Sequence, residues 1–175
     1  DFRRTLPEAE IYVYDNCSTD GTAEVARRAG ATVRREPVPG KGNVVRRMFS
    51  DIDADVYLMV DGDATYDAQA APAMVNKLLE EEVDMVVGAR PIIFDEAHRF
   101  GHGFGNRLFN TLFHRFFGRR FVDIFSGYRA FSRRFVKTFP AISAGFEIET
   151  EMSFHAAQLR RSEEHTSELQ SHSDL

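Results

Sequence analysis

Short stretches rich in β-branched and aromatic residues alternate with helical patterns along the first half of the chain, and this alternation constrains the fold more than any other feature. The strand-like stretches are Ile11–Asp15, Ala31–Arg34, Val56–Val60 and Asp84–Gly88. The helical patterns are Thr22–Ala29, Lys41–Phe49 and a segment that follows Asp67, a residue able to cap it. Strands that alternate with helices favour a largely parallel sheet with helices on both faces. The predicted fold class is therefore α/β, with a mostly parallel sheet flanked by helices.

Length and composition limit the classes of protein that fit. The 175 residues, 43% of them hydrophobic, suit a single domain with its own core. The single cysteine excludes a disulfide framework and a cysteine-rich zinc site. A net charge of −5 gives no case for nucleic-acid binding. No apolar run approaches the ~20 residues that a membrane-spanning helix needs.

The predicted domain covers residues 1–160, and the last part of it contains a candidate strand at Ser126–Phe131 and a candidate helix at Phe146–Leu159. Residues 161–175 are polar and have no helical or strand period. Their sequence resembles the translation of a sequencing-library adapter, and a natural polar tail is the alternative. We expect this segment to be a disordered tail of adapter origin.

Two carboxylates follow the Val56–Val60 stretch, which is apolar throughout as a strand buried on both faces should be. Asp61 and Asp63 are separated by one glycine. The oxygens of both can reach one hard cation, which takes oxygen ligands and bridges phosphates. A solvated turn is the other interpretation of such a pair.

A third carboxylate, Asp15, ends the first predicted strand and is followed by the run from Asn16 to Thr22. Ligands of parallel sheets bind at the carboxyl ends of the strands. A carboxylate at this place can accept hydrogen bonds from ribose hydroxyls or from a base edge. Ser18 or Asp20 is also expected to cap the helix that follows, which does not conflict with a binding role for Asp15.

Four motifs together resemble one enzyme family. They are the run YDNCSTDGT, the loop Gly40-Lys41-Gly42-Asn43, the sequence VDGD and the sequence Ser126-Gly127-Tyr128-Arg129. Their order and spacing resemble those of family 2 glycosyltransferases, and most of all the polyprenyl-phosphate glycosyltransferases related to dolichol-phosphate mannose synthase. The resemblance runs from about residue 5 to residue 160. It implies an inverting enzyme with the GT-A (Rossmann-like) fold.

On the donor side, the resemblance assigns four residues. Asp15 would bind the nucleoside of a nucleotide sugar, and Lys41 would lie near the nucleotide. Asp61 and Asp63 would hold Mg²⁺ or Mn²⁺ on the diphosphate, so that Asp61 contributes to both metal and substrate binding. The cation would stabilise the negative charge that develops on the leaving diphosphate.

On the acceptor side, the resemblance implies a lipid phosphate held by arginines. Arg90 and Arg107 match arginines that hold the acceptor phosphate, and Ser126 matches the acceptor-binding segment. Asp123 and Arg129 are the candidate catalytic residues. Asp123 would act as a base for a hydroxyl acceptor, whereas an acceptor phosphate is already anionic and needs little deprotonation. Burial of Asp123 as an ion partner of Arg129 is an equally weighted alternative.

The chain departs from the family pattern in places. Members open with a strand and a Pro-x-x-Asn-Glu-type segment that contacts the nucleotide, and this chain lacks both, so we expect an N-terminally truncated GT-A domain. Thr65 stands where relatives of the synthase place a glutamine that binds metal. Glu149 lies in a segment, residues 145–151, to which the resemblance assigns no role. The membrane helices that often follow the catalytic domain do not occur in this sequence.

The segment 107–121 alternates arginines with aromatic residues. Its apolar residues fall on one face of a helix and are Leu108, Phe109, Leu112, Phe113, Phe116 and Phe117. One interpretation is a helix that packs on the sheet. The other is an interfacial helix whose arginines contact anionic lipid, which would place the enzyme at the cytoplasmic face of a membrane.

Other functions fit part of the pattern. Asp61-Gly62-Asp63-Ala64-Thr65 matches the DxDxT nucleophile motif of haloacid-dehalogenase-type phosphatases. In that fold the motif follows the first strand and a later acidic pair is required, whereas here it follows two strand–helix units and no such pair occurs. The remaining alternatives are a soluble family 2 transferase acting on a glycan or protein hydroxyl, and a non-enzymatic nucleotide-binding remnant.

Overall fold

The computed structural model describes residues 1–88 and 126–159. In chain order, the elements are α1 (Phe2–Thr5), β1 (Tyr12–Asp15), α2 (Thr22–Arg28), β2 (Thr32–Arg35), α3 (Lys41–Asp51), β3 (Val56–Met59), the 3-10 turn η1 (Ala68–Ala70), α4 (Ala71–Glu80), β4 (Met85–Val87), β5 (Arg129–Ser132) and α6 (Arg133–Thr138), and residues 148–159 are helical. Each predicted strand and helix of the described part is present, with its ends shifted by a few residues.

The strands form two sheets. β1 and β2 pair in parallel, from Tyr12 opposite Thr32 to Asp15 opposite Arg35. The other sheet has the order β3-β5-β4, and β5 runs antiparallel to both of its neighbours, so β3 and β4 run parallel to each other. The predicted α/β class is confirmed. The reversed direction of β5 was not foreseen, because a strand pattern in a sequence carries no information on strand direction.

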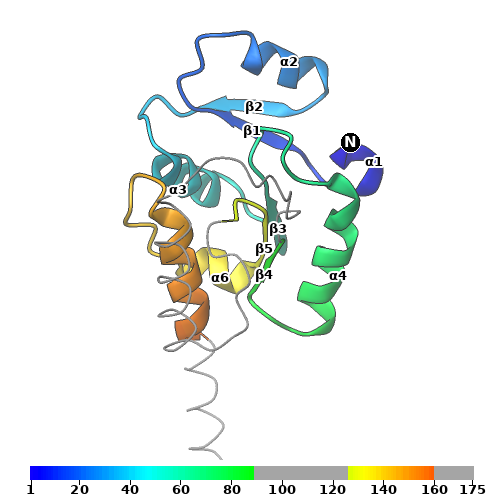
Figure 1. The fold of residues 1–175 in the computed structure, drawn as a ribbon, viewed down its shortest axis with the longest axis vertical. Coiled ribbons are helices and arrows are strands. Elements are labelled where there is room, and N and C mark those ends of the chain that lie inside the picture. The colour runs from blue at the N-terminus through cyan, green and yellow to red at the C-terminus, as the bar shows by residue number, and fades with distance from the viewer. Residues whose placement is uncertain (89–125, 160–175) are drawn as a thin grey trace, which may run out of the picture.

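Helices cover both faces of the β3-β5-β4 sheet. Figure 1 shows α4 on one side of this sheet, and α3 and the 148–159 helix on the other side. Pro72 lies in the first turn of α4, where its missing N–H costs no helical hydrogen bond. Asp67 accepts a hydrogen bond from the backbone of Gln69, so it caps η1, the turn that leads into α4.

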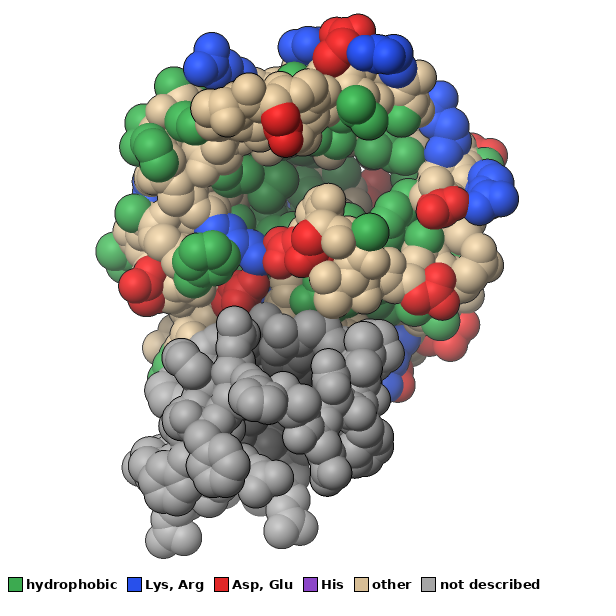
Figure 2. Space-filling model, turned by 45° about the horizontal axis from the view of Figure 1, so that its top comes forward, with side chains coloured by type: hydrophobic (Ala, Val, Ile, Leu, Met, Phe, Trp, Pro, Cys, Tyr) green, Lys and Arg blue, Asp and Glu red, His purple; other side chains and the backbone are tan. Residues whose placement is uncertain are grey.

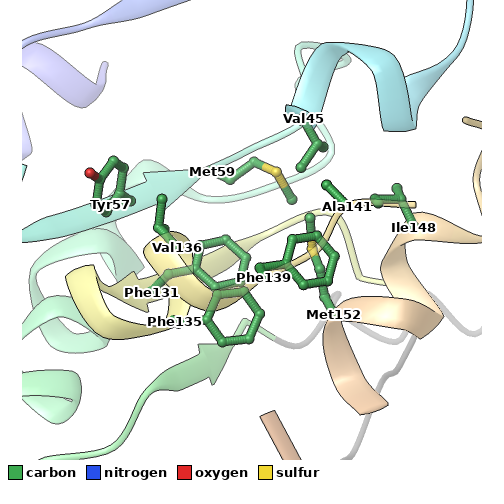
Figure 3. Close-up of a cluster of buried hydrophobic side chains, with 10 residues drawn as sticks. All are labelled: Val45, Tyr57, Met59, Phe131, Phe135, Val136, Phe139, Ala141, Ile148 and Met152. Atoms are coloured by element: carbon green, nitrogen blue, oxygen red, sulfur yellow. The ribbon is translucent and has the colours of Figure 1, made fainter. Parts of the chain in front are cut away.

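Two separate apolar clusters fill the two faces of this sheet. The larger cluster consists of Val45, Tyr57, Met59, Phe131, Phe135, Val136, Phe139, Ala141, Ile148 and Met152 (Figure 3). The other cluster consists of Ala71, Met74, Leu78, Tyr128 and Ala130, with Val56 and Leu58 packed against it. Successive side chains of β3 therefore alternate between the clusters, which confirms the predicted burial of this strand on both faces.

The predicted tail 161–175 lies outside the described residues. Within residues 1–88 and 126–159, no helix combines the length and the apolar character needed to cross a membrane.

Candidate active site

An ion cluster joins three distant parts of the sequence beyond the carboxyl end of β3. Lys41, the first residue of α3, places its Nζ 2.7 Å from Oδ1 and 2.8 Å from Oδ2 of Asp61. The same nitrogen lies 2.5 Å from Oε1 of Glu149, which is 108 positions further along the chain. We call these three residues the Lys41 cluster. Figure 2 shows one face of the molecule with a hollow that apolar side chains line and that basic and acidic side chains border.

Members of the Lys41 cluster differ in their exposure. The side chain of Glu149 is 7% exposed, that of Lys41 15% and that of Asp61 36%. Burial acts to lower the pKa of Lys41, but hydrogen bonds and negative charge from Asp61 and Glu149 outweigh burial, so this pKa is raised. Lys41 therefore stays protonated at neutral pH. The Lys41 cluster thus sets one ammonium group between two carboxyl groups, of which Asp61 is the more exposed.

Close backbone packing fixes the loop that carries Lys41. Gly40 has a φ of +125°, which side chains rarely allow, and a Cβ there would lie 2.4 Å from the carbonyl oxygen of Ala144. A Cβ on Gly42 would lie 2.0 Å from the carbonyl oxygen of Ser143. The N–H of Gly42 donates to the Ala144 oxygen over 2.9 Å. The two glycines of the predicted Gly-Lys-Gly-Asn motif thus let α3 begin directly against the segment before the 148–159 helix.

Asn16 links the end of β1 to this loop. Its Oδ1 accepts a hydrogen bond from the N–H of Gly40 over 2.9 Å. Its Nδ2 donates to the carbonyl oxygens of Glu36, over 2.9 Å, and Val38, over 2.8 Å. The sequence interpretation assigned Asn16 no role. The available signal was its place directly after the strand-ending carboxylate, since asparagine side chains commonly satisfy backbone groups of nearby turns.

Asp15 ends β1 with its side chain turned inward. The residue is 8% exposed, and among the described residues no group donates a hydrogen bond to its Oδ1. Buried polar atoms are usually paired, so an unpaired carboxylate oxygen at the end of a strand is suited to accept a hydrogen bond from a ligand. Binding of a nucleoside by Asp15 stays a prediction.

Asp61 also contacts the Ser126–Arg129 motif. A Cβ on Gly127 would lie 2.1 Å from Oδ2 of Asp61, so the carboxylate rests directly on this glycine. The N–H of Gly127 donates to the hydroxyl of Tyr66 over 2.8 Å. Ser126 is fully buried, and its hydroxyl donates to the carbonyl oxygen of Gly88 over 2.5 Å. Its predicted role in substrate binding is untested, and in this structure its proton is used within the protein.

Arg129 lies in the interior of the fold. It is fully buried, and its guanidinium donates to the carbonyl oxygen of Ser126 over 2.8 Å and to the hydroxyl of Ser153 over 3.0 Å. These contacts fix the segment on which Asp61 rests. A direct part of Arg129 in catalysis stays a prediction.

Asp63 is the more exposed of the two paired carboxylates. Its Oδ1 accepts a hydrogen bond from the backbone N–H of Thr65 over 3.0 Å. Hydrogen bonds from Thr65 hold the pKa of Asp63 below its usual range, so this side chain is an anion at neutral pH. Thr65 thus contributes its backbone to the turn, whereas a role as a metal ligand is untested.

The donor set around Asp61 suits a cation that shares its ligands with a substrate. Residues 1–88 and 126–159 contain no group of three or more His, Cys, Asp or Glu side chains arranged to hold a metal ion. Mg²⁺ usually keeps several waters and is held by one or two carboxylates together with substrate phosphates. Asp61 and Asp63 meet that requirement, provided that a diphosphate supplies further oxygens.

Part of the predicted site lies outside the described residues. This applies to Arg90, Arg107 and Asp123, and to the predicted interfacial helix 107–121. Among the described site residues, an ion pair joins Lys41 to Asp61, and Asp61 rests on Gly127, the neighbour of Ser126. Asp15 precedes Asn16, which bonds to Gly40 directly before Lys41.

Known proteins resemble this chain over most of its length. Residues 2–139 match the family model described as glycosyl transferase family 2. Protein RfbJ of Shigella flexneri is 61% identical over 103 residues, which are 58% of this chain and 80% of that protein. Glycosyltransferase AglJ of Haloferax volcanii is 42% identical over 156 residues, which are 86% of this chain and 50% of that protein. The chain thus spans half the length of AglJ.

Solved structures resemble the fold at lower sequence identity. Glucosyl-3-phosphoglycerate synthase from Mycobacterium tuberculosis in complex with phosphoglyceric acid has a TM-score of 0.66 at 24% identity, covering 85% of this chain and 56% of that one. Its complex with Mn²⁺, uridine-diphosphate-glucose and phosphoglyceric acid has a TM-score of 0.62 at 24% identity, covering 79% and 50%. Such likeness concerns the fold alone, and it confirms the predicted GT-A architecture.

Proposed function

Because the chain belongs to glycosyl transferase family 2, we propose that it transfers a sugar from a nucleoside diphosphate donor to a polyprenyl phosphate, with inversion at the anomeric carbon. One observation carries the proposal. The Lys41 cluster presents the partly exposed carboxylate of Asp61 beyond the carboxyl end of β3, where ligands of α/β sheets bind.

The donor half of the proposal follows from the charges of the described residues. Asp15 would accept a hydrogen bond from the nucleoside, since its Oδ1 is buried and has no donor among the described residues. Asp61 and Asp63 would hold the divalent cation, which neutralises charge on the leaving diphosphate. Lys41 is a protonated amine next to Asp61 and would lie within reach of the same phosphates.

The acceptor half depends on chemistry rather than on described contacts. A phosphate acceptor is already anionic, so it needs groups that hold and orient it more than it needs a strong base. Arg90 and Arg107 are the candidate groups, and Asp123 and Arg129 are the candidate catalytic residues. In the fold neighbour, the bound acceptor is phosphoglyceric acid, which also carries a phosphate. We extend the proposal to the cytoplasmic face of a membrane, where a polyprenyl phosphate is available, with the segment 107–121 as the contact.

A donor and acceptor screen with the full-length protein tests the proposal. Radiolabelled nucleotide sugars are offered with polyprenyl phosphate, and in a parallel reaction with the matching polyprenol, which lacks only the phosphate. We expect metal-dependent transfer to the phosphate and none to the alcohol. The double variant Asp61→Ala plus Asp63→Ala should abolish transfer, whereas Asp55→Ala, at a side chain 97% exposed, should not change it.

Other outcomes of the same screen favour other functions. Transfer only to a glycan or protein hydroxyl favours the soluble transferase, as does failure of the protein to float with liposomes. Transfer to phosphoglyceric acid favours a small-molecule acceptor. The phosphatase alternative is not supported, since the chain belongs to a transferase family and its DxDxT motif follows β3. A phosphoaspartate trapped at Asp61 would restore it.

A further inference from the structure

Lys41 contacts both oxygens of the Asp61 carboxylate and, at the same time, one oxygen of Glu149. We propose that Lys41 competes with the divalent cation for Asp61, and that Glu149 is the positioning residue that retains Lys41 when the cation binds. The inference deepens the proposed function and rests on it, because it takes Asp61 as a ligand of the cation.

The ammonium group of Lys41 and a divalent cation compete for the same oxygens of Asp61. Nζ lies 2.7 Å from one oxygen of Asp61 and 2.8 Å from the other, so the ammonium group bridges the carboxylate symmetrically. A cation bound to the same oxygens would lie next to the ammonium, and like charges at that separation repel strongly in a partly buried site. Binding of the cation therefore requires the ammonium to leave Asp61.

Only the side chain of Lys41 is free to move. The N–H of Gly42 is bonded to the Ala144 oxygen, and the Gly42 Cα packs so closely on Ser143 that a Cβ would lie 2.0 Å from its oxygen. The backbone at the start of α3 therefore stays in place. The flexible four-carbon stem of lysine allows its ammonium to shift between neighbouring partners.

Glu149 is the partner that keeps the displaced ammonium. Its side chain is 7% exposed against 36% for Asp61, so Asp61 is the carboxylate that a cation from solvent reaches first. A buried carboxylate without a counter-charge is costly, so Glu149 favours a state in which Lys41 stays beside it. Glu149 thus provides the ammonium with a second position when Asp61 turns to the cation.

Binding of Mn²⁺ to the full chain, followed by electron paramagnetic resonance without any nucleotide, tests the inference. Lys41→Met should tighten Mn²⁺ binding by at least about tenfold, since the competing charge is gone. Glu149→Gln should weaken it by a few-fold, because the ammonium then has only Asp61. In the Lys41→Met background the effect of Glu149→Gln should largely disappear. Lys77→Met, at an exposed lysine paired with Glu81 on α4, is the control and should change nothing.

Each result supports or overturns the competition between Lys41 and the cation for Asp61. Unchanged or weaker Mn²⁺ binding in Lys41→Met overturns the inference while leaving the cation role of Asp61 intact. A Glu149→Gln effect that persists fully without Lys41 also overturns it, since Glu149 would then act on the cation directly. No Mn²⁺ binding in the wild type and in Lys41→Met overturns the inference alone, because the cation of the proposed function also takes oxygens from the donor diphosphate. Lys41→Arg keeps the positive charge, so this variant should bind Mn²⁺ with wild-type affinity. It is the variant to measure where Lys41→Met does not fold.

Discussion

The carboxylate of Asp61 rests on Gly127, with its carboxyl carbon 2.4 Å from the position that a Cβ on the glycine would take. No side chain other than hydrogen fits there without displacing the carboxylate. The glycine of the Ser126–Arg129 motif thus sets the position of the first acidic residue of the VDGD motif.

Replacing Gly127 with alanine should therefore move Asp61 while leaving the fold intact. The clash involves the end of a flexible side chain, and the glycine backbone has no positive φ that would strain an alanine. We expect Mn²⁺ affinity to fall by about tenfold, equivalent to about 1.4 kcal/mol. Isothermal titration with Mn²⁺ and circular dichroism on the same sample measure both effects.

Gly21→Ala is the matched control for Gly127→Ala. No atom lies within 4 Å of a Cβ built on Gly21, so this alanine meets open space. It should leave Mn²⁺ affinity at the wild-type value. Wild-type affinity in Gly127→Ala would show that Asp61 binds no cation from its present position.

Asn16 should stabilise the fold and, through the loop that it holds, support sugar transfer. Asn16→Ala removes three hydrogen bonds to the loop that ends at Gly40 and leaves backbone groups of Glu36 and Val38 without this donor. A typical hydrogen bond contributes about 0.5–1.5 kcal/mol net, so the free energy of unfolding should fall. The melting temperature should fall by roughly 2–10 °C. Sugar transfer by the full-length protein should fall as well, because the loop carries Lys41.

Asn76→Ala gives the comparison for Asn16→Ala. Asn76 is exposed on α4, and no side-chain hydrogen bond joins it to the described residues. Alanine has the higher helix propensity, so this variant should be as stable as the wild type or slightly more stable. Equal melting temperatures for the two variants would contradict the role of Asn16.

Asp84 should make the stability of the fold depend on pH. Burial acts to raise the pKa of Asp84, but hydrogen bonds from Arg134 and Ser132 outweigh burial and lower it. A carboxylate whose folded pKa is lowered stabilises the fold above its unfolded value of about 3.9, and this stabilisation is lost as the pH falls through the folded pKa. Asp84→Asn should thus lower the free energy of unfolding at pH 7, and this difference should shrink towards about pH 3.

Urea unfolding at several pH values measures the effect of Asp84→Asn. Asp55→Asn is the control, because the Asp55 side chain is 97% exposed and its Arg133 partner is 3.8 Å away. Exposed pairs contribute little, so this variant should follow the wild type at every pH. A stability gap for Asp84→Asn that stays constant from neutral to acid pH would refute the linkage.

The order of elements was predictable from local patterns, whereas their pairing was not. The apolar run Val56–Val60 identified β3, and the acidic pair after it predicts the end of the sheet at which a ligand binds. The predicted single sheet is divided, since β1 pairs with β2 alone and β3 pairs with β5. β5 is separated from β3 by about seventy residues, and such a pairing depends on the whole chain rather than on local periodicity.

Motif spacing identified Asp15, Lys41 and Asp61 as candidate site residues, but not the ion pair between Lys41 and Asp61. Glu149 had no assigned role, because its partnership with Lys41 appears only when the 148–159 helix packs against α3. The guanidinium of Arg129 is buried and bonds to Ser126 and Ser153, which the motif did not foretell, and its predicted part in catalysis stays a prediction. The sequence does not show whether a charged residue in a motif is buried in the fold or binds a ligand.

Asp15 should contribute to ligand binding without stabilising the fold. Its buried Oδ1 has no donor among the described residues, so Asp15→Asn should leave the melting temperature unchanged or raise it, while nucleoside diphosphate affinity falls by about tenfold. Asp20, in the same loop, accepts hydrogen bonds from the N–H and hydroxyl of Thr22 at the start of α2. Asp20→Ala removes the acceptor of both bonds and should thus show the reverse, with lower stability and wild-type affinity. Thermal unfolding and calorimetric titration with uridine diphosphate separate the two patterns, and a lower melting temperature in Asp15→Asn with unchanged affinity would assign Asp15 to the fold.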